Sequence, residues 1–393
     1  MKIAADLFED TATAFAAKST AELQKARWLF QLIANNQLVT IGSGLADFAL
    51  KIHLPVAPLF RYTVYDHFCG GETFEECKGT LQKLSGQRVA AMLNYGVELK
   101  ESEEDFEKTI EKNLEAIAFA GSNETARIVC IKLTGFGRFA LYEKIQSGKA
   151  LTKKETSELD QVKARLRRLC DSALEKKVQL YVDAEESWIQ DALDELVDEV
   201  MPEYNRQQAI LFNTFQFYRH DRLAYLKKCT VAAQKKGFIL GAKIVRGAYM
   251  EKERKRAEEL DYPSPIHVNK EAVDMDFNSG LSWCLEHLEH VALCIASQSE
   301  ASNLLAVKTI VEKKIAPKHP HIVFSQLYGM GDNITFNLAK AGFNAYKYLP
   351  YGPVKEVIPY LIRRAQENTS VGGQTGRELG LIQQELKRRK NER

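Results

Sequence analysis

Short apolar runs recur along most of the chain, and a charged stretch of helical character follows nearly every one. Eight such runs occupy residues 89–97, 127–135, 178–185, 208–216, 238–247, 291–297, 321–327 and 343–352. Runs that are apolar throughout are typical of parallel strands covered on both faces. The alternation predicts an α/β fold, a (β/α)8 TIM-type barrel. A doubly wound open sheet is the alternative.

The segment ahead of the first run is helical instead. Leu23, Ala26, Phe30 and Ile33 are spaced as one face of a helix. We therefore expect an N-terminal helical arm over residues 1–86. A barrel domain over residues 87–393 follows it and ends in a helical tail.

Polar residues close most of the apolar runs, and in a (β/α)8 barrel the active site forms where the strands end. The candidates are Glu98, Lys132, Asp183, Asn213, Lys243 with Arg246, Ser297 with Gln298, Gln326 and Tyr348. For any one of them, a solvated loop position is the alternative. Lys132 and Lys243 are stronger candidates for a functional site, because both lie inside apolar runs and a buried lysine needs a partner.

The stretch after the last run is a predicted amphipathic helix. Its apolar stripe at 100° per residue is Val354, Val357, Ile358, Leu361, Ile362 and Ala365. Tyr360, Arg363, Arg364 and Glu367 fall on the other side. Glu367 is close enough to hold either guanidinium. Paired arginines after the eighth strand are suited to binding a small carboxylate, and an ordinary solvated helix face is the alternative.

Charge and motif content narrow the function further. The chain has 54 Lys and Arg against 52 Asp and Glu, a net charge of +2 that is not typical of a nucleic-acid-binding protein. The amino-terminal sequence has no long apolar segment of the kind that forms the h-region of a signal peptide. No apolar run is long enough to span a membrane.

The seven cysteines are scattered without a CxxC pair, which favours reduced thiols in a cytoplasmic setting. Neither His-containing cluster, 287–290 or 319–321, has the companions of a metal site, so we expect no metal.

Separated motifs in a fixed order carry a resemblance to a known family. They are YVDAEE at 181–186, FNTFQFY at 212–218, GAKIVRGAYMEKER at 241–254, FSQLYGMGD at 324–332 and YLPYGP with YLIRRAQEN between 348 and 368. Together they resemble proline dehydrogenase, also called proline oxidase. The resemblance implies a monofunctional FAD-dependent enzyme with a distorted barrel whose final helix lies over the barrel mouth. It implies oxidation of L-proline to 1-pyrroline-5-carboxylate, the first step of proline catabolism to glutamate. The hydride would pass from proline C5 to flavin N5, and the electrons then to a quinone.

The resemblance also implies roles for particular residues. Lys132, Arg363 and Arg364 would bind the substrate carboxylate, with Glu98 and Glu367 as supporting ion-pair partners. The walls of the substrate ring would be Tyr348, Tyr360 and Leu327. The flavin contacts would be Asp183, Asn213, Lys243, Arg246, Gly247, Ala248, Ser297 and Gln298. Of these, Asp183, Lys243 and Arg246 would be the catalytic group, with Asp183 in an orienting role. Residues 296–299 depart from the family text, which weakens the match at Ser297 and Gln298.

Other functions stay open at this point. A hydroxyproline dehydrogenase would carry out the same chemistry on a hydroxylated ring, and a non-catalytic amino-acid-binding barrel would keep the arginines without the flavin. An aldolase using Lys132 or Lys243 as a Schiff base is a third alternative. We interpret the basic end of the chain, residues 385–393, as a solvated helical tail. Peripheral contact with the inner membrane surface is the alternative for that segment.

Overall fold

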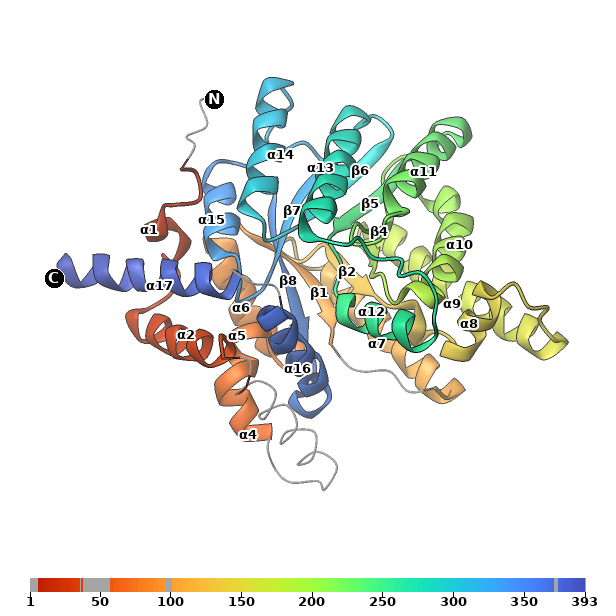
Figure 1. Ribbon diagram of the computed structural model, residues 1–393, viewed down its shortest axis with the longest axis horizontal. Helices are drawn as coiled ribbons and strands as arrows, with labels where there is room; N and C mark the ends of the chain where they lie inside the picture. The colour runs from red at the N-terminus through yellow and green to blue at the C-terminus, as the bar shows by residue number, and fades with distance from the viewer. Residues whose placement is uncertain (1–5, 36, 38–56, 97–100, 371–373, 393) are drawn as a thin grey trace. The chain divides into compact units, whose positions relative to one another are not determined.

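The structure, a computed structural model, describes residues 6–35, 37, 57–96, 101–370 and 374–392 (Figure 1). Eight strands close a parallel barrel in chain order. Their bounds are β1 Ala90–Tyr95, β2 Ile128–Ile131, β3 Gln179–Val182, β4 Leu211–Gln216, β5 Leu240–Val245, β6 Val291–Ala296, β7 Ile322–Leu327 and β8 Ala345–Tyr351. Each strand lies within one of the predicted apolar runs. The barrel prediction is confirmed, and the open sheet is excluded.

The chain divides into two compact units. One contains Met1–Glu98 and Ser325–Arg393, and the other contains Leu99–Phe324. We call them the terminal unit and the central unit. In this division the arm groups with the last strand and the carboxy-terminal helices, and the boundary after residue 86 stays a prediction.

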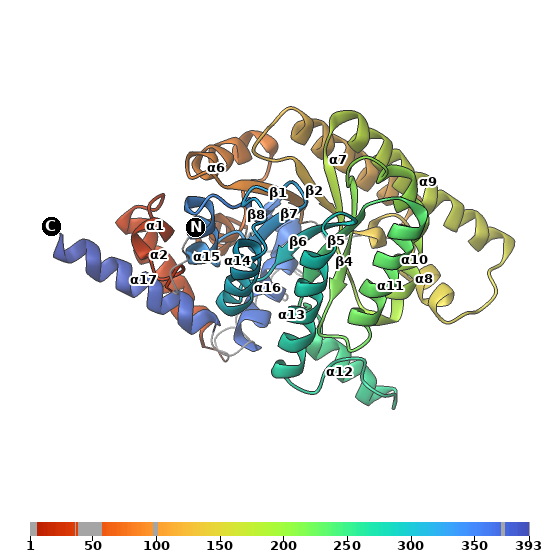
Figure 2. The same ribbon diagram turned by 90° about the horizontal axis from the view of Figure 1, so that it is seen from above.

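Helices cover the strands of the central unit. They are α7 Glu103–Gly121, α8 Phe139–Gln146, α9 Lys153–Lys176, α10 Ser187–Tyr204, α11 Arg222–Lys236, α12 Met250–Glu259, α13 Lys270–Glu286 and α14 Glu300–Glu312, with a short 3-10 helix η2 at Leu133–Gly135. Figure 2 shows α9, α10, α11 and α13 along the outer side of β3 to β6. Polar caps start several of them, as where Thr152 and Glu155 form a reciprocal capping box ahead of α9. The strands are therefore covered by helices, as their apolar sequences require.

The terminal unit combines the helical arm with the end of the chain. Its helices are α1 Thr11–Ala14, α2 Thr20–Ile33, α4 Ala57–Phe60, η1 Arg61–Tyr65, α5 Asp66–Phe68, α6 Phe74–Gly86, α15 Asp332–Lys340, α16 Val354–Ser370 and α17 Gln374–Asn391. In Figure 1, α17 lies beside α2, although the two helices come from opposite ends of the sequence. One buried cluster joins the predicted faces of α2 and α16, and it includes Leu23, Phe30, Val357, Ile358 and Leu361. Both amphipathic patterns are thus confirmed at the described positions.

The carboxy-terminal helix α17 is packed along one side. Leu381 and Ile382 of α17 belong to the same buried cluster. Glu385 is fully buried and accepts from Arg388 and Arg389. Arg389 also donates to the carbonyls of Phe15 and Lys18. The expected solvated tail over residues 385–393 is therefore wrong at Glu385 and Arg389, which pack against the helix and the arm, while Lys387 and residues 390–392 are exposed.

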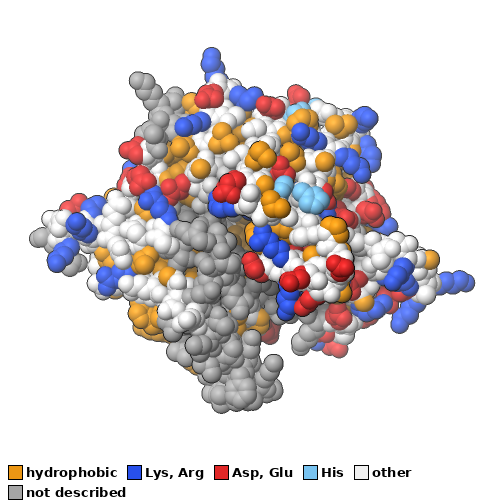
Figure 3. Space-filling model, in the orientation of Figure 1, with side chains coloured by type: hydrophobic (Ala, Val, Ile, Leu, Met, Phe, Trp, Pro, Cys, Tyr) orange, Lys and Arg blue, Asp and Glu red, His pale blue; other side chains and the backbone are white. Residues whose placement is uncertain are grey.

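The surface carries mixed charge. On the face in view in Figure 3, Lys and Arg side chains alternate with Asp and Glu, and no extended region of one sign stands out. This distribution agrees with the small net charge of +2. No helix in the described part of the chain is both long and apolar enough to cross a membrane.

Candidate active site

The strand register sorts the candidate residues of the central unit onto two faces. Thr214 of β4 pairs with Lys243 of β5, which pairs in turn with Cys294 of β6. Paired residues of neighbouring strands share a face, and successive residues alternate between faces. Asn213, one residue from Thr214, therefore points to the opposite face from Lys243.

A buried ion pair links the ends of β3 and β5. The ammonium of Lys243 lies 2.5 Å from Oδ1 of Asp183, and both side chains are buried. Burial alone would lower the pKa of Lys243, but the carboxylate of Asp183 outweighs burial and the pKa is raised. Lys243 therefore stays cationic. A Schiff-base lysine must be neutral to act as a nucleophile, so this pairing disfavours the aldolase alternative for Lys243.

Arg246 is held by side chains from three further segments. Its Nε donates to Asp274 at 2.7 Å, one terminal nitrogen to Ser297 at 2.7 Å, and the other to Ser302 at 2.9 Å. The guanidinium also lies 4.4 Å from the ring centroid of Phe277. The structure thus brings together two predicted residues, Arg246 and Ser297, and fixes the plane of the guanidinium.

The backbone after β5 needs a glycine. Gly247 has φ +136°, in the region that favours glycine, and a Cβ there would lie 2.5 Å from the ring of Tyr218. Ala248 follows and is exposed, while Gln298 lies half-buried after β6. The strand ends therefore combine fixed cations with a stretch of backbone that lacks a side chain.

Asn213 is engaged on the helix side of the strands. Its amide donates to Asp194 of α10 at 2.9 Å, and its carbonyl oxygen accepts from the Thr214 backbone at 2.9 Å. Asp194 also accepts from Gln190 and Arg222. Burial, opposed chiefly by Arg222, raises the pKa of Asp194 to about 6. Both polar atoms of the Asn213 side chain therefore bond to β4 itself and to α10, the helix that covers it.

Two residues outside the predicted set lie at the same strand ends. Gln216 ends β4 two residues beyond Thr214, on the face that carries Lys243, and donates to the Glu185 carbonyl at 2.7 Å. The Glu185 carboxylate accepts from Thr134 at 2.7 Å. Burial raises the pKa of Glu185, and the charge of Lys132 opposes the rise. Gln216 is the last residue of the apolar run 208–216, so the rule that the polar residue closing each run is a candidate would have found it.

The remaining candidates belong mainly to the terminal unit. Leu327 ends β7, and the backbone of Tyr328 donates to the carbonyl of Tyr348 in β8 at 2.9 Å. Tyr360 is buried in α16, although the helical wheel placed it with the polar residues. Arg363, Arg364 and Glu367 lie within α16, but their side chains are outside the described part of the structure, and Glu98 lies outside the described residues. In the central unit, Lys132 directly follows β2 and is half-buried.

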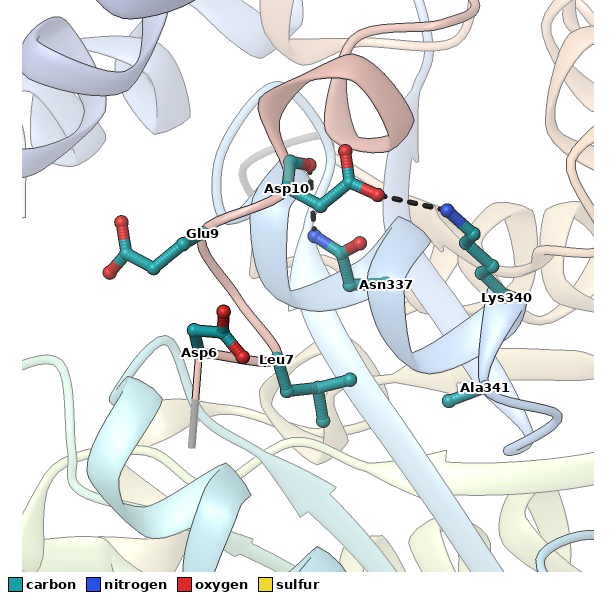
Figure 4. A pocket seen from close by; sticks show the side chains of 7 residues that line it. All are labelled: Asp6, Leu7, Glu9, Asp10, Asn337, Lys340 and Ala341. Carbon is teal, nitrogen blue, oxygen red and sulfur yellow. Dashed lines mark hydrogen bonds and ion pairs between the residues drawn. The ribbon is translucent and has the colours of Figure 1, made fainter. Parts of the chain in front are cut away.

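A separate pocket of about 460 Å³ opens in the terminal unit (Figure 4). Its lining is Asp6, Leu7, Glu9, Asp10, Asn337, Lys340 and Ala341. Asp10 there accepts from Lys340 at 2.9 Å, and its carbonyl accepts from Asn337 at 3.2 Å. The pocket contains none of the predicted site residues. Across the residues that the structure describes, no group of three His, Cys, Asp or Glu could hold a metal ion.

The central-unit strand ends fit a flavin. A flavin needs hydrogen-bond donors along its polar edge, cations near its phosphates and close backbone approach to a flat ring. Lys243, Arg246 and Gln216 supply donors, and Gly247 supplies backbone without Cβ. These groups come from rigid strand ends with defined partners.

Comparison with known proteins identifies the family. The model of the family described as proline dehydrogenase matches residues 77–377. The chain belongs to the proline dehydrogenase family. As a member, it is an oxidoreductase that oxidises proline. This membership confirms the resemblance carried by the separated motifs.

Relatives with similar sequences extend over most of the chain. Proline dehydrogenase 1, mitochondrial, of Dictyostelium discoideum is 30% identical over 97% of this chain and 74% of its own length. The carbapenem antibiotics biosynthesis protein CarD of Pectobacterium carotovorum subsp. carotovorum is 34% identical over 88% of this chain and 90% of its own length. The human proline dehydrogenase 1, mitochondrial, is 39% identical, over 61% of this chain and 40% of its own length.

A solved structure supports the fold. The crystal structure of proline utilization A from Bdellovibrio bacteriovorus matches 92% of this chain with a TM-score of 0.69 and 22% identity. This chain covers 38% of that much longer protein. At this level of identity the likeness concerns the barrel fold alone.

Proposed function

We propose that the protein oxidises L-proline to 1-pyrroline-5-carboxylate with FAD as its cofactor, as the first step of proline catabolism to glutamate. The observation that carries the proposal is the set of fixed charges at the strand ends, in a chain that belongs to the proline dehydrogenase family. Asp183 and Lys243 form a buried pair, and Arg246 is held rigidly by Asp274, Ser297 and Ser302.

The flavin would be held by these strand-end residues and their neighbours. The set is Asp183, Asn213, Lys243, Arg246, Gly247, Ala248, Ser297 and Gln298. We add Gln216, because it lies on the face of the strands that carries Lys243, whereas Asn213 lies on the opposite face. When bound, FAD supplies the hydride acceptor, at N5. Lys243, Asp183 and Arg246 are the residues we propose as the catalytic group, since they present charge that does not have to reorganise during the reaction.

The substrate would be positioned by its carboxylate. Lys132, Arg363 and Arg364 are the proposed cations, and Glu98 and Glu367 would hold them in place. An arginine fork matches the geometry of a carboxylate, so a five-membered ring bound at one end presents the other end in one orientation. Tyr348, Tyr360 and Leu327 would form the wall of the ring site. Two of these belong to neighbouring strands of the terminal unit: Leu327 ends β7, and Tyr348 lies within β8, which continues to Tyr351.

The electrons would then pass to a quinone, reached by peripheral contact of an otherwise cytoplasmic protein with the membrane surface. The basic end of α17 gives this contact little support, since Arg388 and Arg389 are paired with Glu385. We therefore assign no membrane role to α17.

Product analysis tests the proposal. Purified protein supplied with FAD and a soluble quinone should convert L-proline to 1-pyrroline-5-carboxylate, detected by mass spectrometry. Trans-4-hydroxy-L-proline serves as the competing substrate and D-proline as the stereochemical control. Turnover of hydroxyproline in preference to proline would replace the proposal with the hydroxyproline alternative.

A further inference from the structure

A buried lysine of β8 ties down the loop that follows β7. Lys347 is 1% exposed. Its ammonium lies 2.8 Å from Oδ1 of Asp332 and donates to the Met330 carbonyl at 2.5 Å and the Leu327 carbonyl at 3.4 Å. An ammonium has three protons, so these three oxygens satisfy it. All three oxygens belong to one short segment, residues 327–332, which we call the β7–α15 loop.

Other parts of the terminal unit hold the same loop. Lys18 of the arm lies 2.7 Å from Oδ2 of Asp332. The carboxylate of Glu378 in α17 accepts from the backbone of Gly331. Gly329 and Gly331 have φ +82° and +62°, so the loop adopts a conformation that glycine permits. The loop is thus fixed by charges from the arm, from β8 and from α17.

The anchored loop begins at a residue assigned to the substrate wall. Leu327 is its first residue, and the next backbone N–H, that of Tyr328, donates to the carbonyl of Tyr348. Lys347 and Tyr348 are consecutive in β8, so their side chains point to opposite faces of the strand. One residue therefore anchors the loop while its neighbour forms the wall.

Stability alone does not account for a charge at this position. An apolar side chain of similar size is often as stabilising as a buried ion pair, or more so, because two charges must lose their water. A methionine at 347 could fill the space but could not bond the carbonyls of Leu327 and Met330. What the lysine adds is a single defined conformation of the loop.

We propose that Lys347, paired with Asp332, is a positioning residue that sets the substrate wall formed by Leu327 and Tyr348 and so contributes to discrimination between ring substrates. This inference rests on the proposed role of Leu327 and Tyr348 in binding the proline ring. Lys347 itself acts through the loop and does not contact the substrate.

The test compares Lys347→Met with a matched exposed lysine. Lys340→Met in α15 removes a lysine whose partner is Asp10 on the surface. We expect the proline KM of Lys347→Met to rise about tenfold while kcat changes less, and the preference for proline over trans-4-hydroxy-L-proline to fall about tenfold. Lys340→Met should have the KM for proline and the substrate preference of the parent. Because Lys347→Met leaves Asp332 with one fewer cation, Lys347→Met with Asp332→Asn provides a second variant without that excess charge.

Hydrogen exchange gives a readout that does not depend on activity. The N–H groups of Tyr328 and Gly331 should exchange at least about tenfold faster in either Lys347 variant than in the parent or in Lys340→Met. A folded variant with parental exchange and parental substrate preference would overturn the inference. Faster exchange with unchanged preference would also overturn it, since the loop would then not set the wall. A parent protein that oxidises neither substrate would instead refute the proposed function.

Discussion

The ammonium of Lys243 and the carboxylate of Asp183 form a buried ion pair, 2.5 Å apart, between the ends of β5 and β3. The two residues are 60 positions apart in the sequence. Each side chain is buried and neutralises the charge of the other. We propose that the flavin binds beside this pair, with Arg246 as a second fixed cation.

Breaking this pair from one side should be costly. Lys243→Met leaves the Asp183 carboxylate buried without its cation, and we expect the free energy of unfolding to fall by about 3–5 kcal/mol. Chemical denaturation measures this. The control is Lys236→Met, at an exposed position at the end of α11, and its free energy of unfolding should be close to that of the parent.

A double variant separates charge from packing. Lys243→Met with Asp183→Asn should recover much of the lost stability, because neither charge is then left alone, yet it should remain inactive on proline. If Lys243→Met alone is as stable as the parent, Asp183 has enough other partners, and the ion pair does not contribute to stability.

The proposed carboxylate clamp predicts a selective loss of activity. Arg363→Met or Arg364→Met removes one charged donor, worth roughly 2–4 kcal/mol, so kcat/KM for proline should fall about 30- to 1000-fold. Both variants should keep the parental stability and flavin content. Arg168→Met, at an exposed position on α9, is the control. Parental kcat/KM in either clamp variant would mean that this helix face is simply solvated.

The residue at position 348 predicts substrate choice. A hydroxyl on the substrate ring would press on the Tyr348 phenol, so we expect kcat/KM to favour L-proline over trans-4-hydroxy-L-proline by about 100-fold or more. Tyr348→Ser should narrow the gap, mainly by weakening proline. Tyr346→Ser, two residues earlier on the same strand, is a comparison that shortens a tyrosine without touching position 348. Equal kcat/KM for the two substrates in the parent would contradict the assignment.

Glu378 predicts a pH dependence of stability. Burial, with the nearby Asp332 charge, raises its pKa to about 7, against the opposing effects of the Gly331 N–H, Lys347 and Lys18. The folded state therefore binds more protons than the unfolded state between the usual pKa of 4.5 and about 7. In that window the free energy of unfolding falls as pH rises.

Replacing Glu378 should remove this dependence. Glu378→Gln keeps an acceptor for Gly331 but cannot ionise, so its stability relative to the parent should improve by about 1–3 kcal/mol between about pH 5 and about pH 8. Urea unfolding at both values measures the difference. Glu356→Gln, an exposed carboxylate at the start of α16, should show no such change. If the stability of Glu378→Gln changes with pH in the same way as that of the parent, Glu378 does not titrate in this range.

The sequence predicted the parts of the fold that depend on local pattern. Apolar runs located all eight strands, and the stripe of α16 was correct at Val357, Ile358 and Leu361. The motif resemblance gave the family. The pair of Lys243 with Asp183 was indicated by a lysine inside an apolar run, although its partner became visible only in three dimensions.

Features that depend on distant contacts were missed. Asn213 and Gln216 are polar residues of one apolar run on opposite faces of β4, and only the register of β4 against β5 shows which of them shares a face with Lys243. The docking of α17 on the arm depends on Glu385 and Arg389 reaching partners in the first turns of the chain. Lys347 lies inside the apolar run 343–352, as Lys132 and Lys243 lie inside theirs, but the sequence does not reveal the loop oxygens that surround its ammonium.

Flavin absorbance during anaerobic titration with L-proline tests the central claim most directly. Protein prepared with excess FAD and freed of unbound cofactor should be yellow, and L-proline should bleach its flavin band as the substrate reduces the cofactor. FAD should also raise the thermal stability of the protein, because a ligand that binds only the native state stabilises it. Protein that retains no flavin, or retains flavin that L-proline leaves oxidised, would contradict the account.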